Sequence, residues 1–299
     1  MNKYLLPHSL IVKLMSLVSD ETYIKIKWKN WMDYKLNLDN PRTFNEKLQW
    51  IKLNDHNPLY TELVDKYRAK QYVTEKVGSE YVIPLLGQWD NVDEIEWEKL
   101  PNQFVIKCSH DSGSMVLCKD KSAFDVEAAK KKLRSCLKRN YYWESREWPY
   151  KNVKPQIFAE AYMEDEHGEL RDYKWFCFDG EPKVMFVASD RQKNGEETKF
   201  DFYDENFNRL PITNGHPNSS TFIEKPKGFD IMKELASKLS KGLPEVRMDF
   251  YDVNGKVYFG EFTFFHWGGL MPFEPREWDL KFGDWIKLPN NHNMLKYKK

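Results

Sequence analysis

The chain has 299 residues, and its 46 Lys and Arg residues balance 46 Asp and Glu residues, so the formal net charge is zero. This balance argues against a protein that binds nucleic acid by neutralising phosphates along a groove, but it allows one compact basic pocket for a small anion. Aromatic residues make up 15% of the chain, which argues against a disordered protein and for a large core.

The cysteine pattern and the lack of long apolar runs predict a cytoplasmic protein. None of the four cysteines forms a close CxxC pair with another, so we expect reduced, buried thiols. No run approaches the length of about 18 apolar residues that spans a bilayer, so we expect no transmembrane segment. Leu10, Leu14 and Val18 recur at helical spacing; packing on the core is favoured, and peripheral contact with the inner face of a membrane is the alternative.

The first 78 residues are predicted to be helical. Thr43 and Glu46 have the spacing of a capping box, which places a helix start just ahead of Leu48. A second helix is expected to run from near Pro58 to Gly78, where glycine suits the left-handed conformation at a helix C-terminus.

After Gly78 the pattern changes to short apolar runs that are typical of strands. In chain order, we expect strands at Tyr81–Leu86, Phe104–Cys108 and Met115–Cys118, a helix at Val126–Arg139, a strand at Gln156–Met163, a hairpin of Tyr173–Phe178 and Lys183–Ala188, a helix at Phe229–Lys241, and a hairpin of Glu245–Tyr251 and Val257–Phe265. Hairpins mixed with helices predict an α+β fold with mainly antiparallel sheets.

The first candidate site is the strand that ends in Lys107, together with the small polar loop that follows. Backbone N–H groups of Ser112, Gly113 and Ser114 can face a phosphate, and Lys107 can add a positive charge. The alternative is a surface hairpin with an exposed lysine.

The second candidate site is the last predicted hairpin, which carries Arg247, Asp249, Glu261 and Thr263. A two-residue Asn-Gly loop would put Asp249 and Glu261 on opposite faces of the sheet. A turn over residues 252–255 followed by a glycine bulge would instead put all four side chains on one face. Two carboxylates and a hydroxyl without a soft ligand suit Mg²⁺, and the alternative is an acidic sheet face in solvent.

The third candidate is the apolar strand after Gln156, which runs into the acids Glu164, Asp165 and Glu166. Free backbone groups at the end of such a strand can bind the edge of an adenine, and an acid beyond it can hold ribose hydroxyls. This segment alone has little weight.

Together, and in this order, the three segments resemble the ATP-grasp superfamily. The hairpin is similar to that superfamily's Asp/Glu…Glu-x-Asn metal motif, with Thr263 in the Asn place. Segments that resemble the TupA-like ATP-grasp family of polysaccharide-biosynthesis proteins are Pro41–Trp50, Leu63–Tyr67, Leu100–Lys107, Asp172–Pro182 and Tyr258–Thr263. The resemblance extends over residues 40–288.

This resemblance implies an ATP-grasp fold with subdomains at residues 79–155 and 156–289. The sequence pattern adds a helical N-terminal region at 1–78 and a polar, flexible tail at 290–299. It implies ATP and Mg²⁺ as cofactors. The implied reaction is ATP-dependent ligation of an amine to a carboxylate through an acyl phosphate, with a uronic acid of a cell-surface polysaccharide as the expected carboxylate. Contact with membrane-associated polysaccharide machinery is part of the same expectation.

The resemblance also implies roles for single residues. The ATP phosphates would be contacted by Lys107 and Lys174 and covered by a lid of Ser112, Gly113 and Ser114. The adenine hinge would be lined by Glu160, Ala161, Tyr162 and Met163, and the ribose would be held by Glu164 or Glu166. Arg247 would steady the transferred phosphoryl group, and Mg²⁺ would be held by Asp249 and Glu261 with Thr263 as a further oxygen ligand. Because Thr263 replaces an Asn, the number of metal ions stays open.

The candidates for binding the acceptor substrate lie in two further segments. Aromatic rings stack on sugars and arginine pairs with carboxylates, so Arg146, Trp148 and Tyr150 are candidates, and a packed connection is the alternative. Further candidates are Arg191, Trp267, Gly268, Gly269 and His266; a structural role of His266 is the alternative to a catalytic base.

Three other functions compete with the ligase. A phosphotransferase acting on a glycan would use the same fold, a glycosyltransferase would need a nucleotide-sugar site, and a nucleotide-binding assembly protein would lack catalysis. No DxD motif of the usual metal-binding sort supports the glycosyltransferase.

Overall fold

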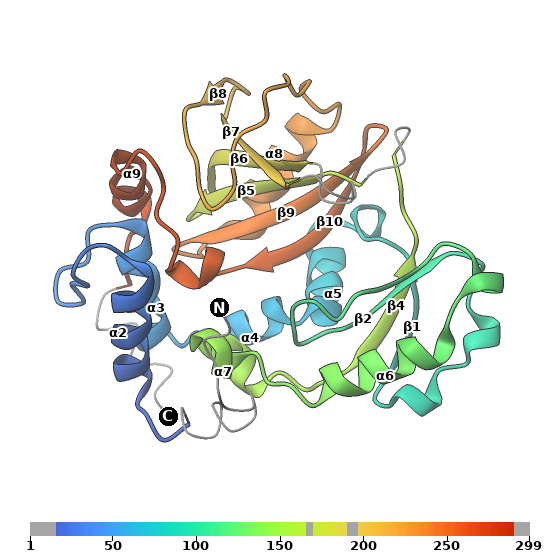
Figure 1. Cartoon of the computed structure of the whole chain (residues 1–299). Coiled ribbons are helices and arrows are strands. Elements are labelled where there is room, and N and C mark those ends of the chain that lie inside the picture. The colour runs from blue at the N-terminus through green and yellow to red at the C-terminus, as the bar shows by residue number, and fades with distance from the viewer. Residues whose placement is uncertain (1–15, 166–169, 190–196, 290–299) are drawn as a thin grey trace.

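Two antiparallel sheets form the framework of the molecule in a computed structural model that describes residues 16–165, 170–189 and 197–289 (Figure 1). The smaller sheet has the strand order β1-β4-β2-β3, with β1 (Leu85–Trp89), β2 (Phe104–Cys108), β3 (Val116–Cys118) and β4 (Ile157–Ala161). The larger sheet has the order β10-β9-β5-β6-β7-β8, with β5 (Asp172–Phe178), β6 (Glu181–Ser189), β7 (Lys199–Asp204), β8 (Arg209–Leu210), β9 (Val246–Val253) and β10 (Lys256–Thr263). The predicted α+β class with antiparallel sheets is confirmed.

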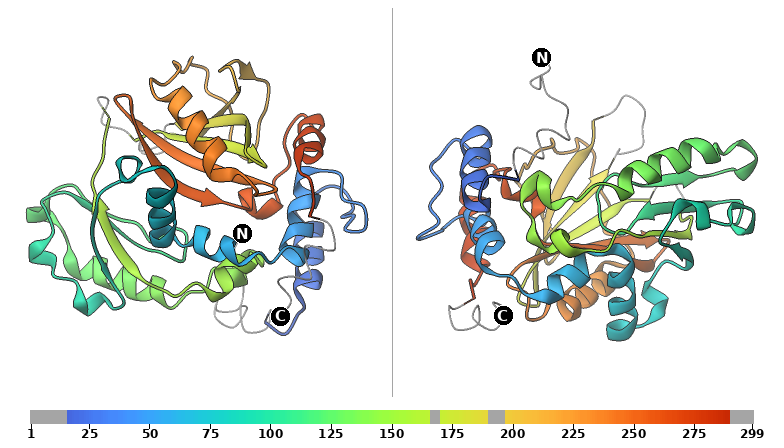
Figure 2. Two further views of the ribbon diagram at one scale, coloured as in Figure 1. Left: turned by 180° about the vertical axis from the view of Figure 1, so that it is seen from behind. Right: turned by 90° about the horizontal axis from the view of Figure 1, so that it is seen from below.

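Helices lie against both sheets, and α4 and α5 lie between the larger sheet and the smaller one (Figures 1 and 2). They are α2 (Asp20–Trp31), α3 (Phe44–Asn54), α4 (Pro58–Val64), α5 (Lys66–Val77), α6 (Val126–Leu137), α7 (Tyr142–Ser145), α8 (Phe229–Ser240) and α9 (Glu277–Trp285). Helix α8 packs on the larger sheet through β5, β6 and β9, and α6 packs on β2 of the smaller one. Helices α4 and α5 both contact β10, so part of the N-terminal region lies against the larger sheet.

The N-terminal helices follow the sequence signals except at Asp65. Thr43 and Glu46 form the predicted capping box at the start of α3. The single helix predicted from Pro58 to Gly78 is wrong, because the Asp65 carboxylate accepts hydrogen bonds from the backbone N–H groups of Tyr67 and Arg68 and starts α5 as a new helix.

The smaller sheet departs from prediction at its first strand. The expected strand Tyr81–Leu86 is wrong in its bounds, since Ser79–Tyr81 forms a short 3₁₀ turn and β1 begins at Leu85. In the larger sheet, β7 and β8 were not predicted, although residues 200–203 alternate apolar and polar side chains in part.

In the β9–β10 hairpin, Asp249 and Glu261 lie on one face as predicted, but the bulge that puts them there is at a different position. The hairpin loop is the two-residue Asn254-Gly255 turn, with φ of 57° and 95°, so the predicted bulge in the turn is absent. A bulge lies instead at Gly260, because Phe259 pairs with Phe250 whereas Glu261 pairs with Asp249. The extra residue restores parity, and Asp249 and Glu261 therefore share a face.

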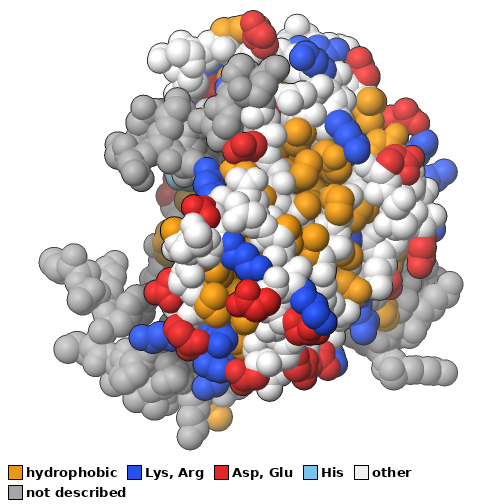
Figure 3. Space-filling model, turned by 90° about the vertical axis from the view of Figure 1, so that its right-hand side faces the viewer, with side chains coloured by type: hydrophobic (Ala, Val, Ile, Leu, Met, Phe, Trp, Pro, Cys, Tyr) orange, Lys and Arg blue, Asp and Glu red, His pale blue; other side chains and the backbone are white. Residues whose placement is uncertain are grey.

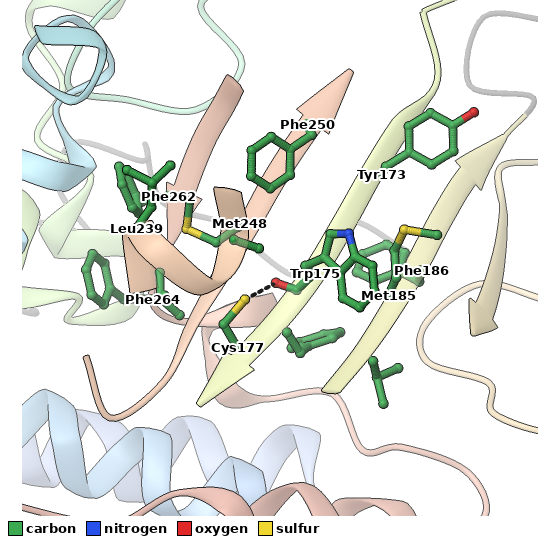
Figure 4. Packing of buried hydrophobic residues seen from close by; sticks show 14 of the residues in the cluster. Tyr173, Trp175, Cys177, Met185, Phe186, Leu239, Met248, Phe250, Phe262 and Phe264 are labelled. Carbon is green, nitrogen blue, oxygen red and sulfur yellow. Dashed lines mark hydrogen bonds between the residues drawn. The ribbon is translucent and has the colours of Figure 1, made fainter. Parts of the chain in front are cut away.

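Among the described residues, most buried aromatic side chains belong to the core cluster around the larger sheet. Figure 4 shows Trp175, Cys177, Met248 and Phe250 packed among other apolar side chains, and Trp175 meets Phe229 of α8 with ring centroids 5.2 Å apart. The smaller sheet has a separate core with Phe104, Ile106 and Leu133. A large part of the aromatic content is thus explained by packing.

The side of the molecule that carries the smaller sheet presents a group of hydrophobic side chains bordered by charged ones (Figure 3). Exposed apolar residues of this sheet and its loops include Leu85, Leu86 and Met115. Across residues 16–165, 170–189 and 197–289, none of the helices is both long and apolar enough to cross a membrane.

Candidate functional site

Three strands of the larger sheet place a row of charged side chains on one face. Lys174 of β5 pairs in register with Asp249 of β9, and Asp249 pairs with Glu261 of β10. Lys174 Nζ forms a short ion pair with the Asp249 carboxylate. Because cross-strand partners on one face are direct neighbours, the row is fixed by backbone pairing and the Gly260 bulge.

Arg247 lies next to this row and is held on several sides. Its Nε donates to Asp249 Oδ1 and its Nη2 to Asp249 Oδ2, both at 2.7 Å, as a two-pronged pair. Nη2 also donates to Thr263 Oγ1 at 3.0 Å, and Nη1 lies 2.7 Å from His266 Nδ1. The guanidinium is therefore fixed in direction before any ligand binds.

The smaller sheet contributes a second buried ion cluster. Glu160 on β4 is paired with Lys107 of β2 through Oε1, and its Oε2 lies 3.0 Å from Lys70 Nζ of α5. Burial raises the pKa of Glu160, but Lys107 and Lys70 outweigh it and lower that pKa to about 2. Glu160 thus carries a negative charge that holds two lysines in place.

Members of both charged groups face one cavity of about 450 Å³ between the two sheets. The predicted site residues that line it are Lys107, Ser112, Gly113, Ser114, Lys174, Asp249 and Glu261. Lys66, Asp111, Arg171, Asp172 and Tyr251 also line it. Segments separated by more than a hundred residues in sequence, predicted to act together, are therefore side by side.

A smaller apolar pocket of about 70 Å³ adjoins the cavity at the smaller sheet. It is lined by Ile83, Val105, Lys107, Met115, Leu117, Glu160, Ala161, Tyr162, Met163, Leu170 and Tyr251. The four residues predicted as an adenine hinge are among them. Glu164 lies just beyond and accepts a hydrogen bond from the Tyr162 hydroxyl at 2.7 Å, whereas Glu166 lies outside the described residues.

Sequence reasoning missed Lys66 and Lys70, which come from the N-terminal helices. Lys66 Nζ donates to the carbonyl oxygen of Asp111 at 2.8 Å and lies 3.5 Å from Glu261 Oε2. The only local signal was Asp65, whose capping role starts α5 and places Lys66 at its first position. The contact to Glu261 spans nearly two hundred residues, so no local pattern indicates it.

The oxygen groups in the cavity fit a hard divalent cation. Burial raises the pKa of Glu261, but Lys66, Lys174, Arg247 and Lys107 lower it to about 2, so this carboxylate is charged. Its side chain is about one-third exposed and its nearest cations are 3.5 Å or more away, which leaves its oxygens accessible. Asp249 is the second carboxylate, and no group of three or more His, Cys, Asp or Glu suited to a metal occurs among the residues described. Two carboxylates with phosphates and waters form a typical Mg²⁺ site.

Thr263 does not line this cavity, because its hydroxyl accepts from Arg247 and orients that guanidinium. A similar role falls to His266, which is buried with Nδ1 against Arg247 and Nε2 2.8 Å from Asn214 Oδ1. Burial and then Arg247 hold the pKa of His266 well below its usual range, so the ring is neutral. The expectation of a base at His266 is not supported, since both ring nitrogens are engaged away from the cavity.

The aromatic segment predicted to face a sugar is largely a packed connection. Arg146 is 1% exposed and lies over the rings of Tyr23, Tyr142 and Trp143, with Asp20 of α2 3.5 Å from its Nη1. Trp148 packs on Tyr60, and Tyr150 contacts Tyr141 with ring centroids 5.0 Å apart. None of Arg146, Trp148 and Tyr150 lines the described cavities.

The glycines after β10 serve a tight turn. Trp267, Gly268 and Gly269 all have positive φ, and Gln49 Nε2 donates to the carbonyl oxygens of both glycines while Lys52 Nζ donates to that of Gly268. Trp267 is half-exposed beside Phe200, away from the cavity lining. Arg191 lies outside the described residues.

Comparisons with known proteins found similar solved structures and one matching family. Similar solved structures include D-alanine–D-alanine ligase from Bacillus anthracis complexed with ATP (14% identity, 68% of this chain and 55% of that chain, TM-score 0.39) and D-alanine–D-alanine ligase from Helicobacter pylori (14%, 82% and 69%, TM-score 0.41). D-cycloserine synthetase DcsG is also similar (15%, 77% and 71%, TM-score 0.42). The chain spans about half the length of the first of these enzymes, and the search of curated proteins found no match.

The family comparison covers most of the chain. Residues 46–287 match the family described as TupA-like ATPgrasp, a range that contains most of α3, both sheets and every group of the cavity named above. The chain therefore belongs to the TupA-like ATP-grasp family and has its α+β ATP-grasp fold, preceded by N-terminal helices.

Proposed function

We propose that the protein is an ATP-dependent carboxylate–amine ligase that forms an amide through an acyl phosphate. One observation supports this most: Lys66, Lys107 and Lys174 converge with Asp249 and Glu261 on a single cavity next to an apolar pocket, and Arg247 is paired with Asp249. Cations for phosphates, two acids for a metal and an apolar slot for a base are the parts that phosphoryl transfer from ATP needs.

Different residues along the cavity bind the adenine, the phosphates, the metal and the substrate carboxylate. The apolar pocket at Ala161–Met163 takes the adenine, and Lys107 and the Ser112–Ser114 loop face the phosphates. Asp249 and Glu261 hold Mg²⁺, which when bound offsets the charge on the phosphoryl oxygens. Arg247 and Lys174 lie beside these acids and hold the substrate carboxylate against the terminal phosphate, because a carboxylate needs a cationic partner to approach another anion.

The carboxylate that we propose is a uronic acid in a cell-surface polysaccharide or its precursor, and the second substrate is an amine. Activation by ATP is needed because a carboxylate is a poor electrophile and phosphate is a good leaving group. Exclusion of water by the Ser112–Ser114 loop protects the activated acyl group from hydrolysis.

An ADP-release screen tests this proposal directly. Glucuronic and galacturonic acids are combined with a panel of amines, and the product mass is read by mass spectrometry. We expect ADP and phosphate to form only when both substrates are present, with a mass equal to the amide. A phosphorylated glycan without amide would show a phosphotransferase instead.

An isotope experiment tests the route. With ¹⁸O in the substrate carboxylate, one labelled oxygen is expected in the released phosphate, since the carboxylate oxygen attacks phosphorus and leaves with it. Amide formed without label in the phosphate would overturn the acyl phosphate route.

A further inference from the structure

A second cavity of about 240 Å³ opens beside the first at the phosphate loop. It is lined by Asp111, Ser112, Gly113, Arg139, Tyr141 and Glu144. Asp111, Ser112 and Gly113 line both cavities, so a molecule in the second one lies next to the phosphate end of the first. Its volume suits a small molecule and not a glycan chain.

Asp111 is the group that points to a ligand. The residue is 2% exposed, and its Oδ2 accepts from Arg139 Nη2 at 2.7 Å. Its Oδ1 has no hydrogen-bond partner within the described part of the chain. A buried carboxylate oxygen without a donor is costly, so it is suited to receive one from a bound molecule.

The walls of this cavity carry more negative than positive charge. Glu144 adds a second carboxylate, and the single cation, Arg139, is engaged by Asp111 and by Cys136 Sγ. Around the Tyr141 hydroxyl, Glu147, then burial, then Glu144 and Glu261 raise the pKa of Tyr141 well above its usual range. This phenol therefore stays protonated as a neutral donor in a negative environment.

The linings of the two cavities differ in their charge balance. Lys66, Lys107, Arg171 and Lys174 in the first lining match its four acids, whereas Asp111 and Glu144 in the second face Arg139 alone. The first lining can therefore hold anionic groups on its lysines, while the acidic excess of the second suits an ammonium ion.

We propose that the second cavity binds the amine substrate as its ammonium ion and that Asp111 Oδ1 accepts the proton that the amine loses before attack. This rests on the proposed ligase function. It assigns Asp111 as the catalytic base, with Arg139 fixing its other oxygen and Glu144 attracting the cation.

The step balances in charge and protons. The ammonium gives one proton to Asp111, and the freed nitrogen lone pair forms the C–N bond to the acyl carbon. The C–O bond to phosphate then breaks with its electron pair going to oxygen. The second nitrogen proton leaves with the phosphate as HPO₄²⁻, so one proton is released to solvent when Asp111 is restored.

A comparison of half-reactions tests the assignment in the full chain with Mg-ATP. Hydroxylamine traps an acyl phosphate chemically, so carboxylate-dependent hydroxamate reports the first half, and amide with ethanolamine or glycine reports the second. For Asp111→Asn we expect hydroxamate close to wild type, a fall in kcat for the amide of about 10²- to 10⁴-fold because the base is lost, and a rise in the KM for the amine of about 10- to 100-fold because a charged hydrogen bond is lost. Equal loss of both would place Asp111 in the first half and overturn the proposal.

A binding measurement separates this proposal from the ligase function. Ethanolamine and glycine are titrated calorimetrically into wild type, Asp111→Asn and Glu144→Gln, each with Mg²⁺ and AMPPNP. We expect binding to wild type, a loss for Asp111→Asn and a smaller weakening for Glu144→Gln. The matched control is Glu127→Gln on the exposed face of α6, which should bind like wild type.

The outcomes distinguish the amine site from the ligase reaction. Equal binding by wild type and Asp111→Asn, or no amine binding by wild type, would overturn the amine site. Amine binding in a protein that gives neither hydroxamate nor amide would support the site but refute the ligase reaction.

Discussion

The β9–β10 hairpin and the segment 141–150 were both candidates for function, and they differ in what surrounds their charges. In the hairpin, Asp249 and Glu261 have cations on the cavity side and strand pairing behind them. In the segment 141–150, Arg146 is enclosed by aromatic rings and the α2 acid Asp20. The contrast teaches that a charge aligned by a sheet toward open space indicates chemistry, whereas a charge enclosed by aromatics indicates structure.

Asp249→Asn gives the largest expected effect and tests the hairpin side of the contrast. Loss of one metal-binding carboxylate should reduce kcat/KM for ATP by about 10³-fold, equal to roughly 4 kcal/mol. The measurement is ADP release with the carboxylate and amine found in the screen.

The matched control is Asp201→Asn, which removes a buried carboxylate that pairs with Arg209 in the larger sheet away from the cavity. It should lower thermal stability and leave ATP turnover nearly unchanged. ATP turnover that survives in Asp249→Asn would refute the metal assignment.

Arg146→Ala tests the structural side of the contrast. It removes a buried guanidinium stacked on three rings, and we expect the free energy of unfolding to fall by about 3 kcal/mol. The KM for ATP should stay near wild type below the melting temperature. Denaturant unfolding measures the first value and ADP release the second.

Arg134→Ala is the control, because Arg134 pairs with Asp93 at the surface and should contribute less than about 1 kcal/mol. Normal stability of Arg146→Ala together with lost activity would make the segment 141–150 functional after all.

Acid unfolding tests the buried cluster around Glu160. Its pKa is lowered from 4.5 to about 2 in the folded state, so its stabilisation is complete above pH 4.5 and is lost as the pH falls toward 2. This window accounts for roughly 3 kcal/mol of the pH dependence of stability. Glu160→Gln should be less stable at neutral pH and should show a flatter decline between these two pH values. A decline as steep as that of wild type would contradict the assignment of the low pKa to Glu160.

Gly260→Ala is expected to have the smallest effect and tests the bulge. A Cβ at this position would lie 3.0 Å from the carbonyl oxygen of Asp249 and 3.3 Å from Tyr251 Cε2, so the strand must shift. We expect a loss of about 1–2 kcal/mol in stability and a fall of about tenfold in kcat/KM, because Glu261 moves with the bulge. Unchanged values in both measurements would show that the bulge does not fix Glu261.

Much of the fold could be predicted because local signals and tertiary packing agree. The capping box at Thr43, the strand Phe104–Cys108 and the hairpin at Asp179-Gly180 all appear near their predicted positions. The turn at Asn254-Gly255 follows its local preference too, and the bulge that corrects its parity lies five residues later at Gly260. A glycine in a strand indicates a bulge only when the register with the paired strand is known, here that of β10 with β9.

The site was predicted in part for the same reason. Lys107, Lys174, Asp249 and Glu261 lie on strands, where period and register determine the face, and they meet in one cavity. Lys66, Lys70 and Asp111 were missed because their partners are far away in sequence: Lys66 meets Glu261, Lys70 meets Glu160 and Asp111 meets Arg139. Arg146 and His266 were given substrate-site roles in the prediction because residue type alone does not show which neighbours enclose a side chain.

Because of helix α5, the N-terminal helices cannot be removed without changing the nucleotide site. This helix supplies Lys66 to the cavity and Lys70 to Glu160, so the N-terminal helices and the nucleotide site share the same charged contacts. A truncation that begins at residue 79 would remove both lysines and leave Glu160 with half of its partners. Bound nucleotide should therefore slow amide hydrogen exchange throughout α5, in a segment that contributes no residue to either sheet.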